Sequence, residues 1–174
     1  MTEVRLPKVA AALYALSIAA LVVFPALIVL AVAVPSLGLF DSVDFTSVPR
    51  DEWPTLTWIG LAVGFLPAIF MWLAVYKMCG LFALYRSGDP LAPQAGPLIK
   101  AIGSYLLISA VLSVIVVPIK TGLMSLGNPV GERSISVALN SSTVGFILVA
   151  GLLCLIGWSM SEATKIAAEN KEFI

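Results

Sequence analysis

The side chains that most often do chemistry in proteins are scarce in this sequence. It contains no histidine, so it lacks the commonest metal ligand and the usual general base near neutral pH. Its two cysteines, Cys79 and Cys154, lie in or beside apolar runs, where we expect them to pack as small hydrophobic residues. The sequence has neither a nucleophile-elbow motif nor a phosphate-binding loop. We therefore expect no enzymatic activity, no metal site and no cofactor.

A single polar stretch, LFALYRSGDPLAPQAGPLIK (residues 81–100), stands between two long apolar runs. Gly88 followed by Asp89-Pro90 predicts the end of a helix, because glycine readily adopts the left-handed conformation and proline disfavours helix in the residue before it. The stretch is either a simple loop or a docking surface for a cytosolic protein partner. The candidate contacts on this surface are Tyr85, Arg86, Gly88 and Asp89.

The C-terminal segment SMSEATKIAAENKEFI has the period of an amphipathic helix. It adds three candidate docking residues, which are Glu162, Glu169 and Asn170. We expect Glu162 to lie within reach of Arg86 or Lys100, where an ion pair would tie the segment to the polar stretch.

The candidate docking residues must be held in place by membrane-spanning helices, which the composition of the chain predicts. The chain has 174 residues, of which 60% are hydrophobic and 11% are charged, whereas about a quarter of a soluble domain is charged. Its apolar runs have the length that a helix needs to cross a bilayer and lack the alternation of a membrane barrel. We predict one all-α integral membrane domain, a four-helix transmembrane bundle. Its spans are residues 9–34, 56–78, 98–119 and 143–162, with outer loops 35–55 and 120–142, a cytosolic loop 79–97 and a cytosolic helix 163–174.

The positions of lysine and arginine predict the orientation of the spans. If both termini are cytosolic, seven basic residues lie on the cytosolic side and three on the outer side. The seven are Arg5, Lys8, Lys77, Arg86, Lys100, Lys165 and Lys171. We therefore predict a multi-pass protein of the cytoplasmic membrane with both termini inside. Ten acidic residues balance ten basic ones, so we expect no direct binding to nucleic acid.

Glycines within the spans predict close helix contacts. Gly60 and Gly64 form a G-x-x-x-G pattern, which lets two helices approach closely within one chain or in a homo-oligomer. Gly145, Gly151 and Gly157, together with Ala150, predict a small-residue surface on the fourth span for a neighbouring helix.

Prolines and serines within the spans carry further expectations. Pro25 and Pro67 lie mid-span, where each is expected to kink its helix. We expect the serines of the spans, Ser109 and Ser113 among them, to bond to carbonyls of their own helix.

The second outer loop contains an alternating pattern after the Asn128-Pro129 turn. Ile135, Val137 and Leu139 alternate with small or polar residues, which is typical of a strand. We predict either a small extracytoplasmic β element, paired with residues 43–48 of the first outer loop, or an amphipathic segment on the membrane.

Three segments resemble a bacterial family of four-span membrane proteins, the domain of unknown function two-nine-seven-five. They are LFALYRSGDPL, GNPVGERSISVALNSS and GWSMSEATKIAAENKEFI. The matching positions are Leu81, Phe82, Tyr85, Gly88, Asn128, Pro129, Gly131, Glu162, Ala163, Glu169 and Asn170. The chain departs from the family at Leu91, where an aromatic residue is common. The resemblance implies a bacterial inner membrane and, as a partner, a small helix-turn-helix regulator encoded nearby.

Two classes of function follow from these observations. The first is a membrane-embedded sensory or regulatory protein whose cytosolic face holds a protein partner. The alternative is a transporter or channel subunit, or a toxin-immunity protein. The spans carry no Asp, Glu, Lys, Arg or His near their centres, and such residues are typical of ion-coupled transporters. We therefore favour the first class.

Overall fold

The computed structural model describes residues 5–34, 52–89, 92–137 and 139–172, and all of its regular elements are helices. They are α1 (Arg5–Ala33), α2 (Thr55–Gly64), α3 (Leu66–Arg86), α4 (Ala95–Ser125) and α5 (Ser141–Glu172). Four stretches are long and apolar enough to cross a membrane, with α2 and α3 sharing one of them. The predicted all-α class with four spans is thus confirmed. α4 continues to Ser125, past the predicted boundary at residue 119.

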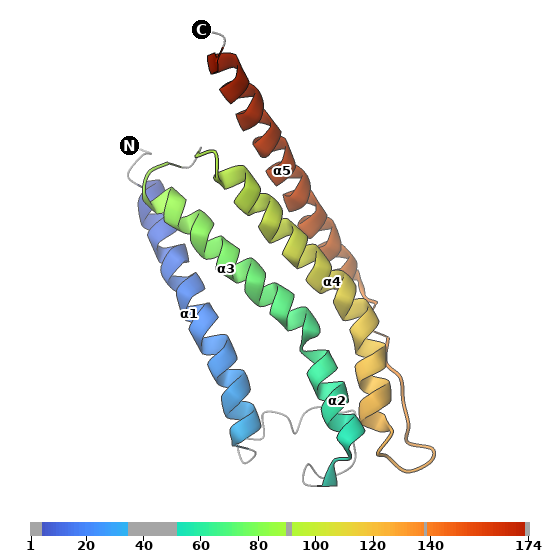
Figure 1. Ribbon diagram of the computed structural model, residues 1–174. Coiled ribbons are helices and arrows are strands. Elements are labelled where there is room, and N and C mark those ends of the chain that lie inside the picture. Colours follow the sequence, from blue (N-terminus) through green and yellow to red (C-terminus); the bar gives the residue numbers. More distant parts are fainter. Residues whose placement is uncertain (1–4, 35–51, 90–91, 138, 173–174) are drawn as a thin grey trace.

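The spans stand side by side in an open row, in the order α1, α3, α4, α5 (Figure 1). Among the described residues, α1 contacts α3 but neither α4 nor α5, and α5 contacts only α4. The row does not close on itself, so the predicted arrangement of the four spans as a bundle is not confirmed. Both termini lie at one end of the row, together with the connection between α3 and α4 (Figure 1). We call this the terminus end, and the opposite end the far end.

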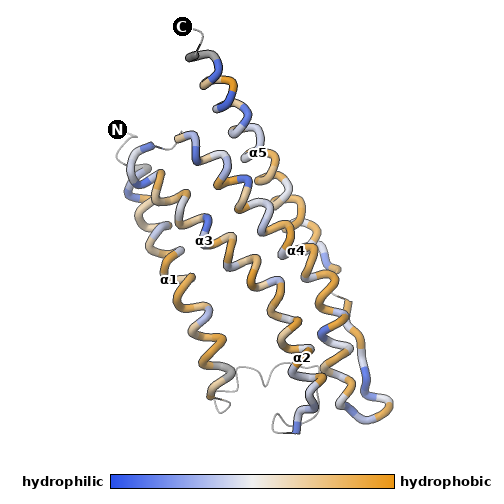
Figure 2. Tube along the Cα trace, viewed as in Figure 1, coloured by the Kyte–Doolittle hydropathy of each residue, from blue (hydrophilic) through white to orange (hydrophobic). Residues whose placement is uncertain are grey.

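Two lysines of α4 lie about as far apart as the hydrocarbon core of a bilayer is thick. Lys100 and Lys120 lie twenty residues apart on one helix, which corresponds to about 30 Å along its axis. The hydrocarbon core of a bilayer is also about 30 Å thick. We therefore use Lys100 as the reference point for depth at the terminus end and Lys120 as the one at the far end. Figure 2 shows the corresponding pattern, with apolar residues along the middle of the row and a hydrophilic end to α5.

The second span is broken where Pro67 enters it. Proline has no backbone N–H and clashes with the preceding turn, so an α-helix seldom passes through it unchanged. α2 ends at Gly64 and α3 begins at Leu66, with Phe65 between them. The break redirects the span, because α2 packs on α4 while the outer part of α1 has no contact with α2. The expected kink at this proline is therefore present as a one-residue break at Phe65, whose amide donates to the carbonyl of Ala62 and whose carbonyl accepts from the amide of Ile69.

Pro25 has a different effect, since α1 continues through it as one helix. Its missing N–H leaves the carbonyl of Leu21 without its usual helical donor. The indole N–H of Trp72, on α3, donates to this carbonyl at 3.1 Å. A side chain of the neighbouring helix thus replaces the lost bond, as hydrocarbon surroundings require.

The segment between α4 and α5 runs back along α4 and forms no strand in its described part, residues 126–137 and 139–140. The amides of Ser134 and Ser136 donate to the hydroxyls of Ser125 and Thr121 at 3.3 and 3.0 Å. Helix hydroxyls thus satisfy the amides that a second strand would have paired. The alternating side chains Ile135, Val137 and Leu139 are 72%, 70% and 65% exposed. The β element predicted there is absent, and its proposed partner, residues 43–48, lies outside the described residues.

Candidate functional site

The polar stretch begins with the predicted helix end. Gly88 has a φ of 85°, and the amide of Asp89 donates to the carbonyl of Leu84 at 3.3 Å. This is the hydrogen-bonding pattern of a Schellman motif, which satisfies the last carbonyls of a helix. Gly88 therefore ends α3 where the sequence predicted.

The candidate residues of this stretch are not equally available to a partner. The guanidinium of Arg86 lies 5.0 Å from the ring centroid of Tyr14, a cation–π contact that joins the terminus ends of α3 and α1. Tyr85 is half-buried against a core cluster that includes Leu81 and Ala95. Asp89 is exposed. Arg86 and Tyr85 thus have partners within the chain, and Asp89 points outward.

α5 extends past Lys100 at the terminus end. Gly157 lies against Lys100, so the residues from 158 to 172 continue beyond this reference point by about 22 Å. Glu162 and Glu169 are exposed on this extension, and the side chain of Asn170 lies outside the described residues. Within the described residues, no ion pair joins Glu162 to Arg86 or Lys100, contrary to expectation. The helix turns Ser161 toward α4, so Glu162, about 100° further round, faces away.

α4 and α5 meet along a seam of small residues. A Cβ added to Gly103 would lie 2.5 Å from the amide nitrogen of Cys154, and one added to Gly157 would lie 2.6 Å from the Cα of Lys100. Gly96 faces Ser161 in the same way. The sequence analysis missed Gly96 and Gly103, although their seven-residue spacing is typical of one helix face.

Two of the predicted packing glycines lie elsewhere. No atom comes within 4 Å of a Cβ built on Gly145 or Gly151. Both face open space on α5, because the side of this helix that meets α4 carries Ala150, Cys154 and Gly157 instead. The predicted small-residue surface therefore retains Gly157 and Ala150, which is fully buried, and loses Gly145 and Gly151.

The G-x-x-x-G pattern of α2 faces α4 within the chain. A Cβ on Gly60 would lie 3.0 Å from Cβ of Leu123, and a Cβ on Gly64 would lie 2.8 Å from Cδ of Lys120. Both glycines therefore serve an intramolecular contact, which leaves them covered against a second copy of the chain.

Hydroxyl groups link the helices in the far-end half of the row. Ser109 of α4 donates to the carbonyl of Pro67 at 2.8 Å, so the expectation that it bonds to its own helix is wrong. Ser113 does bond within α4, to Ala110. Thr57 is fully buried and its Oγ1 has no hydrogen-bond partner among the described residues.

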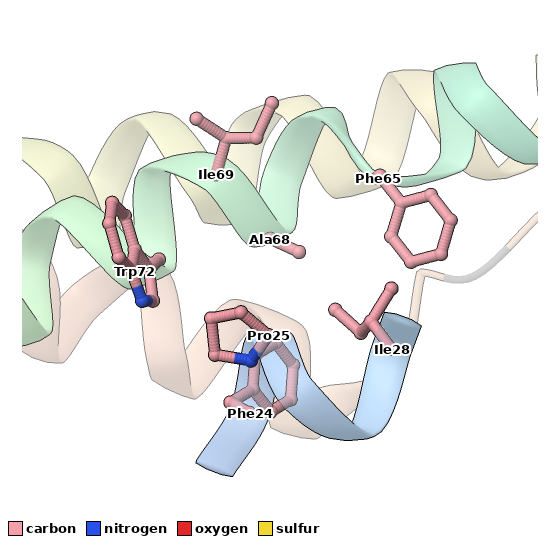
Figure 3. A pocket seen from close by; sticks show the side chains of 7 residues that line it. All are labelled: Phe24, Pro25, Ile28, Phe65, Ala68, Ile69 and Trp72. Atoms are coloured by element: carbon pink, nitrogen blue, oxygen red, sulfur yellow. The ribbon is translucent and has the colours of Figure 1, made fainter. Parts of the chain in front are cut away.

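An apolar cleft opens between α1 and the broken second span (Figure 3). Its volume is about 380 Å³. It is lined by Phe24, Pro25, Ile28, Phe65, Ala68, Ile69 and Trp72. Figure 3 shows the methyl group of Ala68 between Pro25 and Phe65, with Trp72 at one end of the cleft. The cleft exists because α1 follows α3 while α2 turns away toward α4.

The described residues offer little for covalent or metal chemistry. They contain no group of three or more cysteine, aspartate or glutamate side chains that could hold a metal ion. Cys79 and Cys154 are free thiols, and Cys154 lies in the seam, 3.6 Å from the hydroxyl of Ser104.

Comparison with known proteins identifies one family. No curated protein matches the chain, and no solved structure matches it. The family model described as protein of unknown function (DUF2975) matches residues 45–174, which include α2 to α5 and the polar stretch. The chain, with its four helices able to cross a membrane, therefore belongs to the DUF2975 family.

Proposed function

We propose that this protein is a non-enzymatic, membrane-embedded interaction protein that holds a cytosolic protein partner at its terminus end. The observation that carries the proposal is the extension of α5. This helix continues about 22 Å beyond the depth of Lys100, and its described side chains from Glu162 to Glu169 are exposed, with the exception of half-buried Thr164.

The extension has two different faces. Ile166 is 53% exposed, and it shares an apolar side with Ala163 and Ala167, whereas Lys165 and Glu169 lie on another side. A charged helix needs no apolar stripe to stay soluble in the cytosol, so the stripe favours a protein partner that packs against it. Asp89 is exposed beside the end of α3, so it offers the partner a polar contact at the same end of the row.

The cytosolic placement of this end rests on charge. Most of the basic residues lie at the terminus end, which is the side that the positive-inside rule assigns to the cytosol. The family resemblance implies a helix-turn-helix regulator as the partner. The open row argues against a channel within a single chain, because α1 and α5 do not meet and the four spans surround no central path.

The test is site-specific photocrosslinking in native membranes. A benzophenone residue in place of Ile166 is expected to trap a soluble protein. The same residue in place of Leu148, which is 68% exposed but lies deep in the span, is expected to trap none. An Ile166→Asp variant should then fail to co-purify the trapped protein. If both positions trap the same proteins, or if Ile166→Asp retains its partner, the proposal is wrong.

A further inference from the structure

We propose that the apolar cleft between α1 and the broken second span binds one acyl chain of a membrane lipid. This site is separate from the proposed partner surface, since it lies in the far-end half of the row. Its chemistry, depth and size each narrow the choice of occupant.

The lining excludes a polar ligand. All seven side chains are hydrophobic, and the single polar group among them is the indole N–H of Trp72. This N–H already donates to the carbonyl of Leu21, at 3.1 Å. A ligand that needs a hydrogen bond would therefore leave its polar groups unsatisfied inside the cleft, at a substantial free-energy cost.

The depth of the cleft places it in hydrocarbon. At one end is Phe65, which follows Gly64, the residue packed on Lys120. Trp72 lies seven residues further along α3, or about 10 Å deeper along the helix axis. The cleft therefore extends from the depth of Lys120 into the hydrocarbon core. A lipid with its head group at that depth can place one of its chains directly between Pro25 and Phe65.

The width of the cleft suits a thin occupant. An α-helix is about 10 Å across, so it could lie over this open cleft of about 380 Å³ but could not enter it. An extended hydrocarbon chain is much thinner. A lipid chain is also always present at this depth, so mass action favours its binding. The bound chain completes the row where α1 and α2 have no contact.

The first experiment is native mass spectrometry of the full chain in detergent with dioleoyl phosphatidylethanolamine. We expect the unchanged protein to retain one lipid and the Ala68→Phe variant to lose it, because the added ring fills the cleft. The matched control is Ala62→Phe, at an exposed residue of α2 outside the cleft, which should retain the lipid. Equal retention by both variants would refute the site. So would a dimer that only Ala68→Phe dissolves, because the occupant would then be a second copy.

A second experiment does not depend on filling the cleft. Phenylalanine replaces Trp53, Trp58 and Trp158, so that Trp72 alone fluoresces. A phosphatidylethanolamine with brominated chains, titrated into the detergent-solubilised protein, should quench this fluorescence and saturate at one lipid per chain. Quenching that rises without saturation would show only non-specific lipid contact and would overturn the proposal.

Discussion

Replacing Gly103 with alanine tests whether the seam between α4 and α5 depends on a missing side chain. The new Cβ would lie 2.5 Å from the amide nitrogen of Cys154 and 2.9 Å from the carbonyl oxygen of Ala150. Both are backbone atoms, so no side-chain rotation relieves the clash. α5 must move outward by about 0.9 Å to bring the nearest atom to 3.4 Å, an ordinary contact distance.

The cost of this movement outweighs the benefit of alanine in a helix. A gap of 0.5–1 Å forfeits roughly a quarter to a half of the dispersion energy of each contact, and overpacking typically costs about 1–3 kcal/mol. Alanine in place of glycine contributes about 0.5–1 kcal/mol to a helix. We expect Gly103→Ala to lower the free energy of unfolding by about 1–2 kcal/mol.

The matched control is Gly151→Ala on α5, where nothing lies within 4 Å of the added Cβ. This variant should gain the helix benefit alone, so the same substitution should raise the free energy of unfolding by roughly 0.5 kcal/mol. The change in the free energy of unfolding should therefore be negative for Gly103→Ala and positive for Gly151→Ala. This difference separates the effect of packing from that of helix propensity.

The assay has two readouts. Unfolding in mixed micelles of mild detergent and dodecyl sulfate gives the free energies. The labelling rate of Cys154, measured with Cys79 changed to serine, reports the seam directly, because this thiol lies between the two helices. Gly103→Ala should speed the labelling and Gly151→Ala should leave it unchanged. Equal stability and equal labelling in both variants would refute the seam.

Three further predictions follow from single contacts. Trp72→Phe should destabilise the chain by about 0.6 kcal/mol, the average for a hydrogen bond between membrane helices. In a double-mutant cycle, Pro25→Ala should abolish this effect, because the new backbone N–H at position 25 can donate to the carbonyl of Leu21. Arg86→Ala should cost about 0.5–1 kcal/mol when position 14 is Tyr14 or phenylalanine and nothing when it is leucine, as measured by the same unfolding assay. Thr57→Val should be neutral or stabilising by up to about 1 kcal/mol, because the buried hydroxyl has no hydrogen-bond partner among the described residues; a clear destabilisation would contradict this.

The helices and their ends followed from local physics. A long apolar run must be helical in lipid, and Gly88 ends a helix because only glycine readily adopts its φ of 85°. The break at Pro67 follows from the absence of a backbone N–H. Each of these features depends on a few neighbouring residues, so the sequence was enough to predict it.

The packing of one span on another could not be predicted in the same way. Gly145 and Gly157 look alike in the sequence, yet only Gly157 faces α4, because the facing side depends on the rotation of both helices. The open row and its cleft likewise depend on the packing of α2 against α4 and not against α1. The alternating segment after Asn128 was predicted as either a strand or an amphipathic segment on the membrane, because alternation shows only which side chains share a face. It does not show that the hydroxyls of Thr121 and Ser125 would accept from its amides in place of a second strand.

α5 is displaced along its axis relative to α4. Its first turn shares a hollow with Ser109 and Ser113 of α4, so it begins inside the depth marked by Lys120. From Ser141 to Gly157 the helix covers only about 24 Å, less than the hydrocarbon thickness of about 30 Å. The stretch of α5 that is long and apolar enough to cross a membrane continues to Glu169, so the turns after Gly157 supply the missing length. The displacement therefore brings the polar first turn of α5, with Ser142 and Thr143, beside Ser109 and Ser113 of α4 instead of shortening the span.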